Sequence, residues 1–308
     1  MRQLYVARAP GSSGRAITFD LRNALAILLS RVCRRRICNR STPSWRAALT
    51  PQQIEQAAGA LKAARKDNRM LAGLDDGLTP RSMEDGYALQ DAFMRIWEEP
   101  VAGWKVGATA EKVQELYGVS EPFCGPFYVP TTFTSPAEPK ARDFGHFCIE
   151  SEFAFRFGST LAARKRAYDR EEILGAIEAV LPAFELISPR FDTLLQDRIA
   201  LAAADCGLNG GFVLGEDYAN WRGLDLAAHG VRLSVDGEVK GEGTGANALG
   251  HPFNVLDWLV NELSRRGIDL NAGEIVSTGT CTGIVFLEQG QKAVADYGVL
   301  GTIEVTFA

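Results

Sequence analysis

The stretch Phe147-Cys-Ile-Glu-Ser-Glu-Phe-Ala-Phe-Arg-Phe157 alternates apolar and polar side chains. This period of two predicts a β-strand, because successive side chains of a strand point to opposite faces. Glu150 and Glu152 then share one face, with Cα atoms roughly 7 Å apart. Two such carboxylates repel each other unless a proton, a base or a cation lies between them. A half-exposed strand with Glu150, Glu152 and Arg156 on its polar face also explains the pattern.

A third carboxylate, Glu185, interrupts the otherwise uncharged stretch Ala179-Val-Leu-Pro-Ala-Phe-Glu-Leu-Ile187. On an apolar strand an acid must find a partner or undergo a large pKa shift. Arg190 is one candidate partner, and a cation shared with Glu150 and Glu152 is the other. Carboxylate oxygens would favour Mg²⁺ or Mn²⁺ over zinc in such a site.

Zinc is not expected elsewhere either, because only three histidines occur and no cysteines pair at the short spacing of a zinc site. The cysteines instead favour free thiols in a reducing compartment, which predicts a cytoplasmic protein. The six cysteines are Cys33, Cys38, Cys124, Cys148, Cys206 and Cys281.

Lys105 lies in Gly103-Trp-Lys-Val-Gly107, whose glycines allow a ligand or another backbone segment to come close. Its ammonium group could face a substrate carboxylate or an enolate. A lysine that extends from a strand end to solvent explains the same residues.

Two glycine-containing stretches near the C-terminus are candidate ligand contacts. Gly241–Pro252 matches neither the dinucleotide fingerprint nor a P-loop, so we expect a turn-rich connection with a structural His251. Ser277-Thr-Gly-Thr280 follows an apolar strand and could present hydroxyl and N–H groups to a substrate carboxylate. Ser277, Thr278 and Thr280 are therefore candidate substrate-binding residues, although a plain turn is an equal alternative.

The 308 residues carry a formal net charge of −5, which argues against a nucleic-acid partner. No apolar run approaches the ~18 residues that a membrane-spanning helix needs, so no membrane partner is expected. Residues 1–50 are rich in arginine and contain one acid, Asp20. A transit-type leader or an atypical signal would also explain this composition, but we expect a poorly ordered extension that takes no part in the chemistry.

The remaining chain predicts an α+β fold. Thr50 and Ser82 are helix start signals, which predicts a small helical N-terminal part over residues 51–100. Residues 101–308 form a β-rich catalytic domain of mostly antiparallel strands with two helices, Arg170–Ala179 and Pro252–Arg266. The expected strands are Gly103–Gly107, Phe147–Phe157, Ala179–Ile187, Gly211–Gly215, Val231–Val235, Glu274–Ser277, Lys292–Tyr297 and Gly301–Phe307.

Several of these segments together resemble the 2-keto-4-pentenoate hydratases of the fumarylacetoacetate hydrolase superfamily. The resemblance covers about residues 51–308 in family order and spacing. The matching segments are Gly103–Gly107, Tyr117–Pro122, Glu150–Phe155, Pro182–Ile187, Leu249–Pro252, Val255–Leu263, Ala272–Thr280 and Val299–Phe307.

The resemblance implies a mixed β-roll with a small helical N-terminal part, assembled into homo-oligomers. It also implies that Glu150, Glu152 and Glu185 bind Mg²⁺ or Mn²⁺ and that Lys105 is the family's catalytic lysine. The sequence departs from the family in two places. Phe123 stands where hydratases usually carry an acid/base aspartate, and Asp205-Cys206 replaces the usual Asp-Asn.

The implied function is a lyase of aromatic catabolism that adds water to a 2-hydroxy-2,4-dienoate and yields a 4-hydroxy-2-oxo acid. Because Phe123 cannot transfer a proton, Glu121 or a metal-bound water is the candidate for that step. Decarboxylation of a 2-oxo dicarboxylate, or hydrolytic cleavage of an acylpyruvate, would use the same chelation of a 2-oxo acid. A non-catalytic protein that binds 2-oxo acids is the alternative from another functional class.

Overall fold

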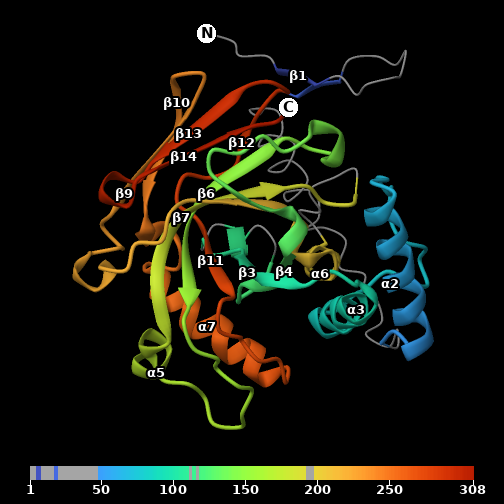
Figure 1. The fold of residues 1–308 in the computed structure, drawn as a ribbon. Coiled ribbons are helices and arrows are strands. Elements are labelled where there is room, and N and C mark those ends of the chain that lie inside the picture. Colours follow the sequence, from blue (N-terminus) through green and yellow to red (C-terminus); the bar gives the residue numbers. More distant parts are fainter. Residues whose placement is uncertain (1–4, 8–16, 20–47, 111–112, 116–117, 192–197) are drawn as a thin grey trace, which may run out of the picture. The chain divides into compact units, whose positions relative to one another are not determined.

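The computed structural model describes residues 5–7, 17–19, 48–110, 113–115, 118–191 and 198–308 (Figure 1). The chain divides into two compact units, Met1–Ala47 and Ala48–Ala308. In the first unit, β1 (Tyr5–Ala7) and β2 (Ile17–Phe19) form an antiparallel pair. The remainder of the predicted extension up to residue 47, with Cys33 and Cys38, lies outside the described residues. The second unit carries every predicted site residue.

Helices α2, α3 and α6 pack together in the second unit. α2 (Pro51–Lys66) begins after Thr50, whose side chain accepts a hydrogen bond from the Gln53 N–H. α3 (Met83–Ile96) begins after Ser82, which caps it in the same way, so both predicted helix starts are confirmed. α6 (Ile199–Ala204) lies so close to α3 that a Cβ at Gly86 would be 2.5 Å from a backbone oxygen. Among the described residues, no helix is long and apolar enough to cross a membrane.

The larger sheet is mixed and has the strand order β4-β3-β11-β6-β7-β8-β5, with β12 paired to β6. β11 is parallel to β3, β5 is parallel to β8, and all other neighbours are antiparallel. The strands are β3 (Val101–Gly107), β4 (Phe123–Tyr128), β5 (Thr132–Thr134), β6 (Cys148–Phe157), β7 (Ile177–Ile187), β8 (Asn209–Leu214), β11 (Ile275–Thr280) and β12 (Val285–Phe286).

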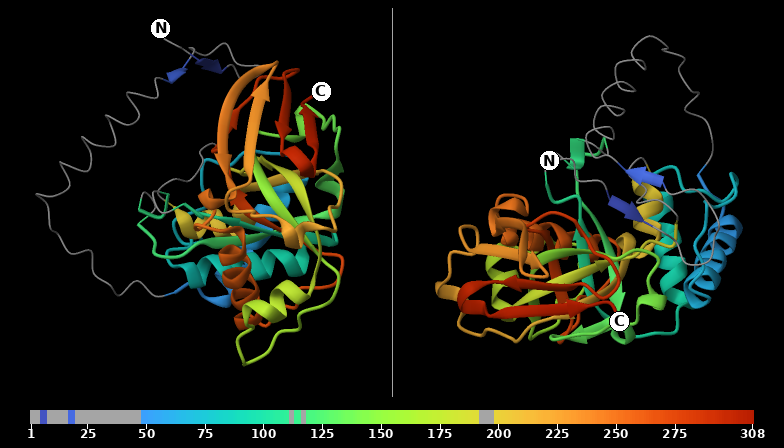
Figure 2. Two further views of the ribbon diagram at one scale, coloured as in Figure 1. Left: turned by 90° about the vertical axis from the view of Figure 1, so that its left-hand side faces the viewer. Right: turned by 90° about the horizontal axis from the view of Figure 1, so that it is seen from above.

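The smaller sheet is antiparallel and has the order β10-β9-β13-β14. Its strands are β9 (Gly230–Val235), β10 (Glu238–Thr244), β13 (Lys292–Asp296) and β14 (Thr302–Thr306). The main apolar core joins the two sheets to α7 (Pro252–Arg265), which contacts α5 (Arg170–Gly175). Figures 1 and 2 show the smaller sheet at one side of this unit and α2 and α3 at the other. The predicted α+β class is confirmed.

The structure corrects two predicted elements. The helix predicted for Arg170–Ala179 ends at Gly175, because the β-branched and apolar residues from Ile177 onward continue into β7 instead. The glycine-rich connection starts as strand β10, and a Cβ at Gly243 would lie 1.9 Å from the Cys281 carbonyl oxygen. The glycine therefore permits close strand packing. His251 is structural, as predicted: its Nδ1 caps α7 by accepting the Phe253 N–H at 3.0 Å.

Candidate metal centre

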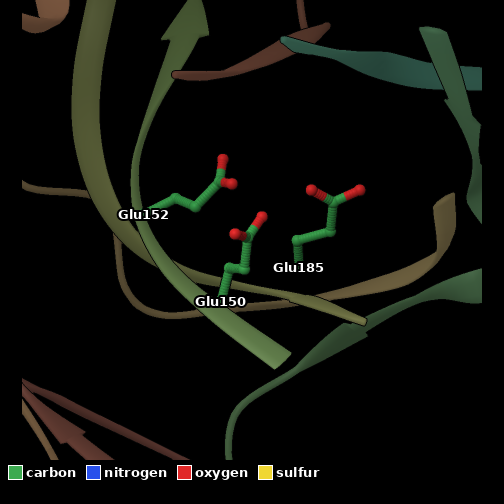
Figure 3. A group of neighbouring side chains, drawn as sticks. All are labelled: Glu150, Glu152 and Glu185. Atoms are coloured by element: carbon green, nitrogen blue, oxygen red, sulfur yellow. The ribbon is translucent and has the colours of Figure 1, made fainter. Parts of the chain in front are cut away.

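Antiparallel pairing of β6 and β7 brings the three predicted carboxylates together. Glu150 lies directly opposite Glu185, and Glu152 lies opposite Ala183. One carboxylate oxygen from each of the three glutamates lies within 4.8 Å of those of the other two. Figure 3 shows the three side chains pointing toward one another from these two neighbouring strands. The opposite faces of β6 and β7 contribute phenylalanines to the main core.

Burial makes this arrangement electrostatically unfavourable without a cation. Glu152 and Glu185 are fully buried, and Glu150 is partly buried. Burial and the neighbouring Glu185 raise the pKa of Glu150 to about 7. Burial, followed by the charges of Glu185 and Glu150, also raises the pKa of Glu152 well above its ordinary value. The three carboxylates cannot all be ionised here at low energetic cost.

Lys105 supplies one positive charge to the cluster. Its Nζ lies 3.1 Å from Glu185 Oε2 and donates a hydrogen bond to the Gly207 carbonyl oxygen at 3.0 Å. Burial by itself lowers the pKa of Lys105, but the charges of the three glutamates outweigh it, and the pKa is raised. The side chain is buried, so the alternative of a solvent-extended lysine is wrong.

Arg190, the other partner considered for Glu185, lies elsewhere. Its guanidinium donates to the Ser188 carbonyl and hydroxyl oxygens and to the side chain of Asn68. The alternative of an Arg190–Glu185 ion pair is therefore wrong, because Arg190 turns toward the helical part and Lys105 pairs with Glu185 instead.

The residues present fit a divalent cation. Three carboxylates and one ammonium group leave two negative charges uncompensated when all are ionised. In addition, Glu152 Oε1 is buried and accepts no hydrogen bond. A buried acceptor without a partner costs about 1–3 kcal/mol, more when it is charged. A divalent cation held by these oxygen atoms would compensate the two negative charges and give Glu152 Oε1 a partner.

The other oxygen of Glu152 is held by β11. Ser277 donates its hydroxyl proton to Glu152 Oε2, and the Gly279 N–H donates to the same atom at 2.9 Å. Gly279 has φ +91° and a Cβ there would lie 2.1 Å from Thr109 Oγ1, so only glycine fits. These two donors leave Oε1 as the oxygen available to a ligand.

The predicted substrate-binding hydroxyls all have protein partners. The Ser277 hydroxyl binds Glu152, and Thr278 donates to the Phe153 carbonyl oxygen at 2.9 Å. Thr280 Oγ1 accepts a hydrogen bond from the Gly283 N–H at 2.8 Å. Ser277 is thus placed to orient the carboxylate of Glu152, and Thr278 to join β11 to β6.

The structure does not bring Glu121 into the carboxylate cluster. Its side chain is exposed and lies within electrostatic range of Arg265, at the end of α7. Phe123, by contrast, is buried beside the cluster, and its ring centroid lies 5.6 Å from Lys105 Nζ. An aromatic ring therefore borders the lysine on this side, where it stabilises the ammonium charge.

Asn209 is a neighbour of the cluster that the sequence did not reveal. Its Nδ2 donates a hydrogen bond to Glu185 Oε1 at 3.0 Å, and the side chain is buried. A β-bulge between β7 and β8 turns this side chain toward Glu185. The one available signal was Gly210-Gly211 directly after Asn209, a pair typical of bulges.

Comparison with known proteins gives a consistent result. The family profile of the fumarylacetoacetate (FAA) hydrolase C-terminal region matches residues 123–308. The 2-keto-4-pentenoate hydratase of Paraburkholderia xenovorans strain LB400 is 31% identical over 262 residues, which cover 84% of this chain and 96% of that protein. The 2-hydroxyhexa-2,4-dienoate hydratase of Comamonas testosteroni is 30% identical over 264 residues, covering 83% and 98%.

The fold is also found in 4-oxalocrotonate decarboxylase of Pseudomonas putida G7, whose structure holds magnesium and adipate. The TM-score is 0.78 at 24% identity, and the superposition covers 85% of this chain and 99% of the decarboxylase. This likeness shows the fold, and the hydratase relatives show the family. The chain belongs to the 2-keto-4-pentenoate hydratase family of enzymes within the fumarylacetoacetate hydrolase superfamily.

Proposed function

We propose that this enzyme adds water to a 2-hydroxy-2,4-dienoate and yields a 4-hydroxy-2-oxo acid, with Mg²⁺ or Mn²⁺ held by Glu150, Glu152 and Glu185. The observation that carries the proposal is the buried, undercompensated carboxylate cluster beside Lys105 in a chain of this family. We also propose that the chemistry resides in residues 101–308, since all three glutamates belong to β6 and β7, and that residues 51–100 support it.

The metal ion, when bound, supplies Lewis-acid stabilisation of the negative charge that develops on the C2 oxygen of the substrate. Lys105 holds its proton, because the three glutamates raise its pKa above the ordinary value. It therefore acts as a fixed positive charge next to Glu185 and not as a base. Ser277 and the Gly279 N–H orient Glu152 through its Oε2.

The net reaction consumes one water molecule and involves no oxidation. The substrate loses the proton of its 2-hydroxyl group and gains one on carbon, and water then adds across the double bond conjugated with the new carbonyl. The water must lose one proton while carbon gains another. Glu121 remains our candidate for this transfer, and Glu121→Gln tests it: a slower hydration step with unchanged metal affinity would support that role.

The proposal is tested with metal-free protein and a small panel of 2-hydroxydienoates and 2-oxo acids. We expect loss of the dienoate ultraviolet absorbance only after Mg²⁺ or Mn²⁺ is added, with a 4-hydroxy-2-oxo acid identified by mass spectrometry. Glu185→Gln should lower this rate more than 100-fold, whereas a matched surface variant, Glu55→Gln, should leave it unchanged. Carbon dioxide release, or cleavage of an acylpyruvate, would instead assign a decarboxylase or a hydrolase. Binding without turnover would assign a non-catalytic protein.

Two coarser properties complete the proposal. We propose a homo-oligomer, as in the family, which light scattering coupled to size-exclusion chromatography measures directly. We also propose a cytoplasmic location, because the four described cysteines (Cys124, Cys148, Cys206 and Cys281) are free thiols. Cell fractionation tests the location, and a secreted, disulfide-linked product would contradict it.

A further inference from the structure

We infer that Asn209 and Arg65 are positioning residues for the carboxylate cluster, which they reach through the turn Asp205–Asn209. The inference rests on the metal site proposed above and extends it to the helical part of the chain. Neither residue is itself one of the three carboxylates. Each acts by fixing a group: Asn209 fixes Glu185, and Arg65 fixes the turn that carries Asn209.

The first step is the contact between Asn209 and Glu185. The Asn209 amide donates to Glu185 Oε1 at 3.0 Å and to the Gly211 carbonyl oxygen at 3.3 Å. Because both partners are acceptors, the NH₂ group must point this way. Lys105 holds the other oxygen of Glu185. The carboxylate plane of Glu185 is thus fixed from two sides before any ligand arrives.

The second step explains why this asparagine reaches the glutamate. On β8, Phe212 lies opposite Glu185 and Asn209 lies opposite Ile187. Residues three apart on a regular strand face opposite sides, yet these two share one face. The bulge adds Gly210 as an extra residue, so Asn209 and Phe212 point to the same face of the sheet. A Cβ at Gly210 would lie 2.5 Å from the Ser188 Cβ, so this position needs glycine. Without the bulge, Asn209 would point away from the cluster.

The third step concerns the turn before Asn209. Three consecutive residues have positive φ angles: Cys206 at 52°, Gly207 at 70° and Leu208 at 69°. Two of them carry a Cβ, so the turn stores conformational strain that surrounding contacts must hold. The turn directs the Gly207 carbonyl oxygen toward Lys105. The Lys105 Nζ donates a hydrogen bond to this oxygen at 3.0 Å. One turn therefore orients Glu185 through Asn209 and Lys105 through Gly207.

The fourth step identifies what holds the turn. Arg65 of α2 reaches across with one nitrogen, Nη2, which lies 3.2 Å from Asp205 Oδ1 and 3.1 Å from the Asn209 carbonyl oxygen. Asp205 also accepts the Arg190 N–H at 2.7 Å. The Arg65 side chain is 12% exposed and that of Asp205 2% exposed, so water competes little with this pair. Arg65 thereby joins helix α2 to Asn209, which in turn binds Glu185.

The test measures Mn²⁺ binding directly, by the electron paramagnetic resonance signal of free Mn²⁺. Groups that orient metal ligands typically contribute 10–100-fold to metal affinity. We therefore expect Asn209→Ala to raise the Kd for Mn²⁺ about tenfold or more. Arg65→Ala should raise the Kd for Mn²⁺ by a smaller factor. When Arg65→Ala is added to Asn209→Ala, the further rise in Kd should be smaller than the rise that Arg65→Ala causes in the wild type. That non-additivity is the signature of one path.

A matched control separates positioning from general destabilisation. Asn261 on α7 also donates its amide to backbone carbonyls, those of Tyr168 and Asp257. Asn261→Ala should lower the Tm of the metal-free protein and leave the Kd for Mn²⁺ unchanged. If Asn209→Ala does not fold, Asn209→Ser replaces it, because serine lacks the amide donor and is too short to reach Glu185 in the same way, but keeps a small polar side chain.

Three results would overturn the inference: wild-type Mn²⁺ affinity in the Asn209 variant, additive effects of the two substitutions, or an equal loss of affinity in Asn261→Ala. Absence of Mn²⁺ binding in the wild type would instead refute the proposed metal site itself. The two failures are therefore distinguishable in one set of titrations.

Discussion

Two clusters of charged residues in this protein differ in whether their charges cancel. In the first, which we call the Arg266 clamp, Arg266 at the end of α7 donates to Gln90 Oε1 at 2.8 Å and to Asp91. Its guanidinium group also lies over the ring of Tyr87, 4.2 Å from the centroid. The clamp has one cation and one carboxylate, and it joins α7 to α3.

The carboxylate cluster is built differently. It sets one ammonium group against three carboxylates, and Glu152 Oε1 has no hydrogen-bond partner. Removing charges from water is costly, so a protein gains nothing for its own stability from an imbalance of this kind. The Arg266 clamp balances its charge within the chain, although Arg266 Nε has no hydrogen-bond partner, whereas the carboxylate cluster leaves a net negative charge. Between these two clusters, charge balance distinguishes the structural one from the candidate functional one.

The largest expected effect is the response of stability to metal. At a free Mg²⁺ concentration 1,000 times its Kd, the wild type should gain about 4 kcal/mol of unfolding free energy. Glu150→Gln should lose most of this gain. The same substitution should stabilise the metal-free protein by about 1 kcal/mol, because Glu150 lies directly opposite Glu185. Urea unfolding with and without chelator measures both quantities, and a metal-free variant less stable than the wild type would contradict the second.

Arg266→Ala should have the opposite profile. It removes the hydrogen bonds to α3 and the ring contact from a side chain that is 5% exposed, beside an Asp91 side chain that is 38% exposed. We expect a loss of about 3 kcal/mol in unfolding free energy, while the Mg²⁺-dependent gain remains that of the wild type. A reduced Mg²⁺ gain in Arg266→Ala would show that the two clusters are not independent.

A pH series tests the carboxylate cluster alone. The pKa of Glu150 is about 7 in the folded, metal-free protein, above the ordinary glutamate value of about 4.5. Between these two pH values, Glu150 is protonated in the folded state and ionised in the unfolded state. The unfolding free energy should therefore fall as pH rises from about 4.5 to 7, and above pH 7 Glu150 should cause no further change. The expected loss is on the order of 3 kcal/mol. Urea unfolding in chelator should show this slope in the wild type and a weaker one in Glu150→Gln.

The sequence predicted the charged face of the cluster because that face depends on local periodicity. Strand alternation alone placed Glu150 and Glu152 on one side of β6, and the uncharged surroundings of Glu185 indicated a buried acid. Both features are properties of single strands and survive in the structure. The family resemblance gave the mixed β-roll and joined the three residues, which no local pattern could do.

The neighbours of the cluster were not predictable because they depend on long-range pairing. Lys105 meets Glu185 although β11 and β6 separate β3 from β7 in the sheet, so no local sequence pattern indicates this contact. Strand β4 (Phe123–Tyr128) was missed because its sequence contains Gly125 and Pro126, residues that are depleted in strands. Asn209 was missed because a bulge reverses the strand parity that sequence analysis assumes.

The smallest expected effect belongs to an exposed ion pair, which shows that distance does not decide what a charge pair contributes. Arg95 Nη2 lies 2.6 Å from Glu55 Oε1, closer than Lys105 Nζ to Glu185 Oε2 at 3.1 Å. The Arg95 and Glu55 side chains are 60% and 53% exposed, so water and salt screen their attraction. Arg95→Ala should therefore change the unfolding free energy by no more than about 0.5 kcal/mol, without effect on the Kd for Mn²⁺. A loss above about 1 kcal/mol would mean that contact distance outweighs burial, and charge balance would then no longer distinguish the carboxylate cluster from the other ion pairs.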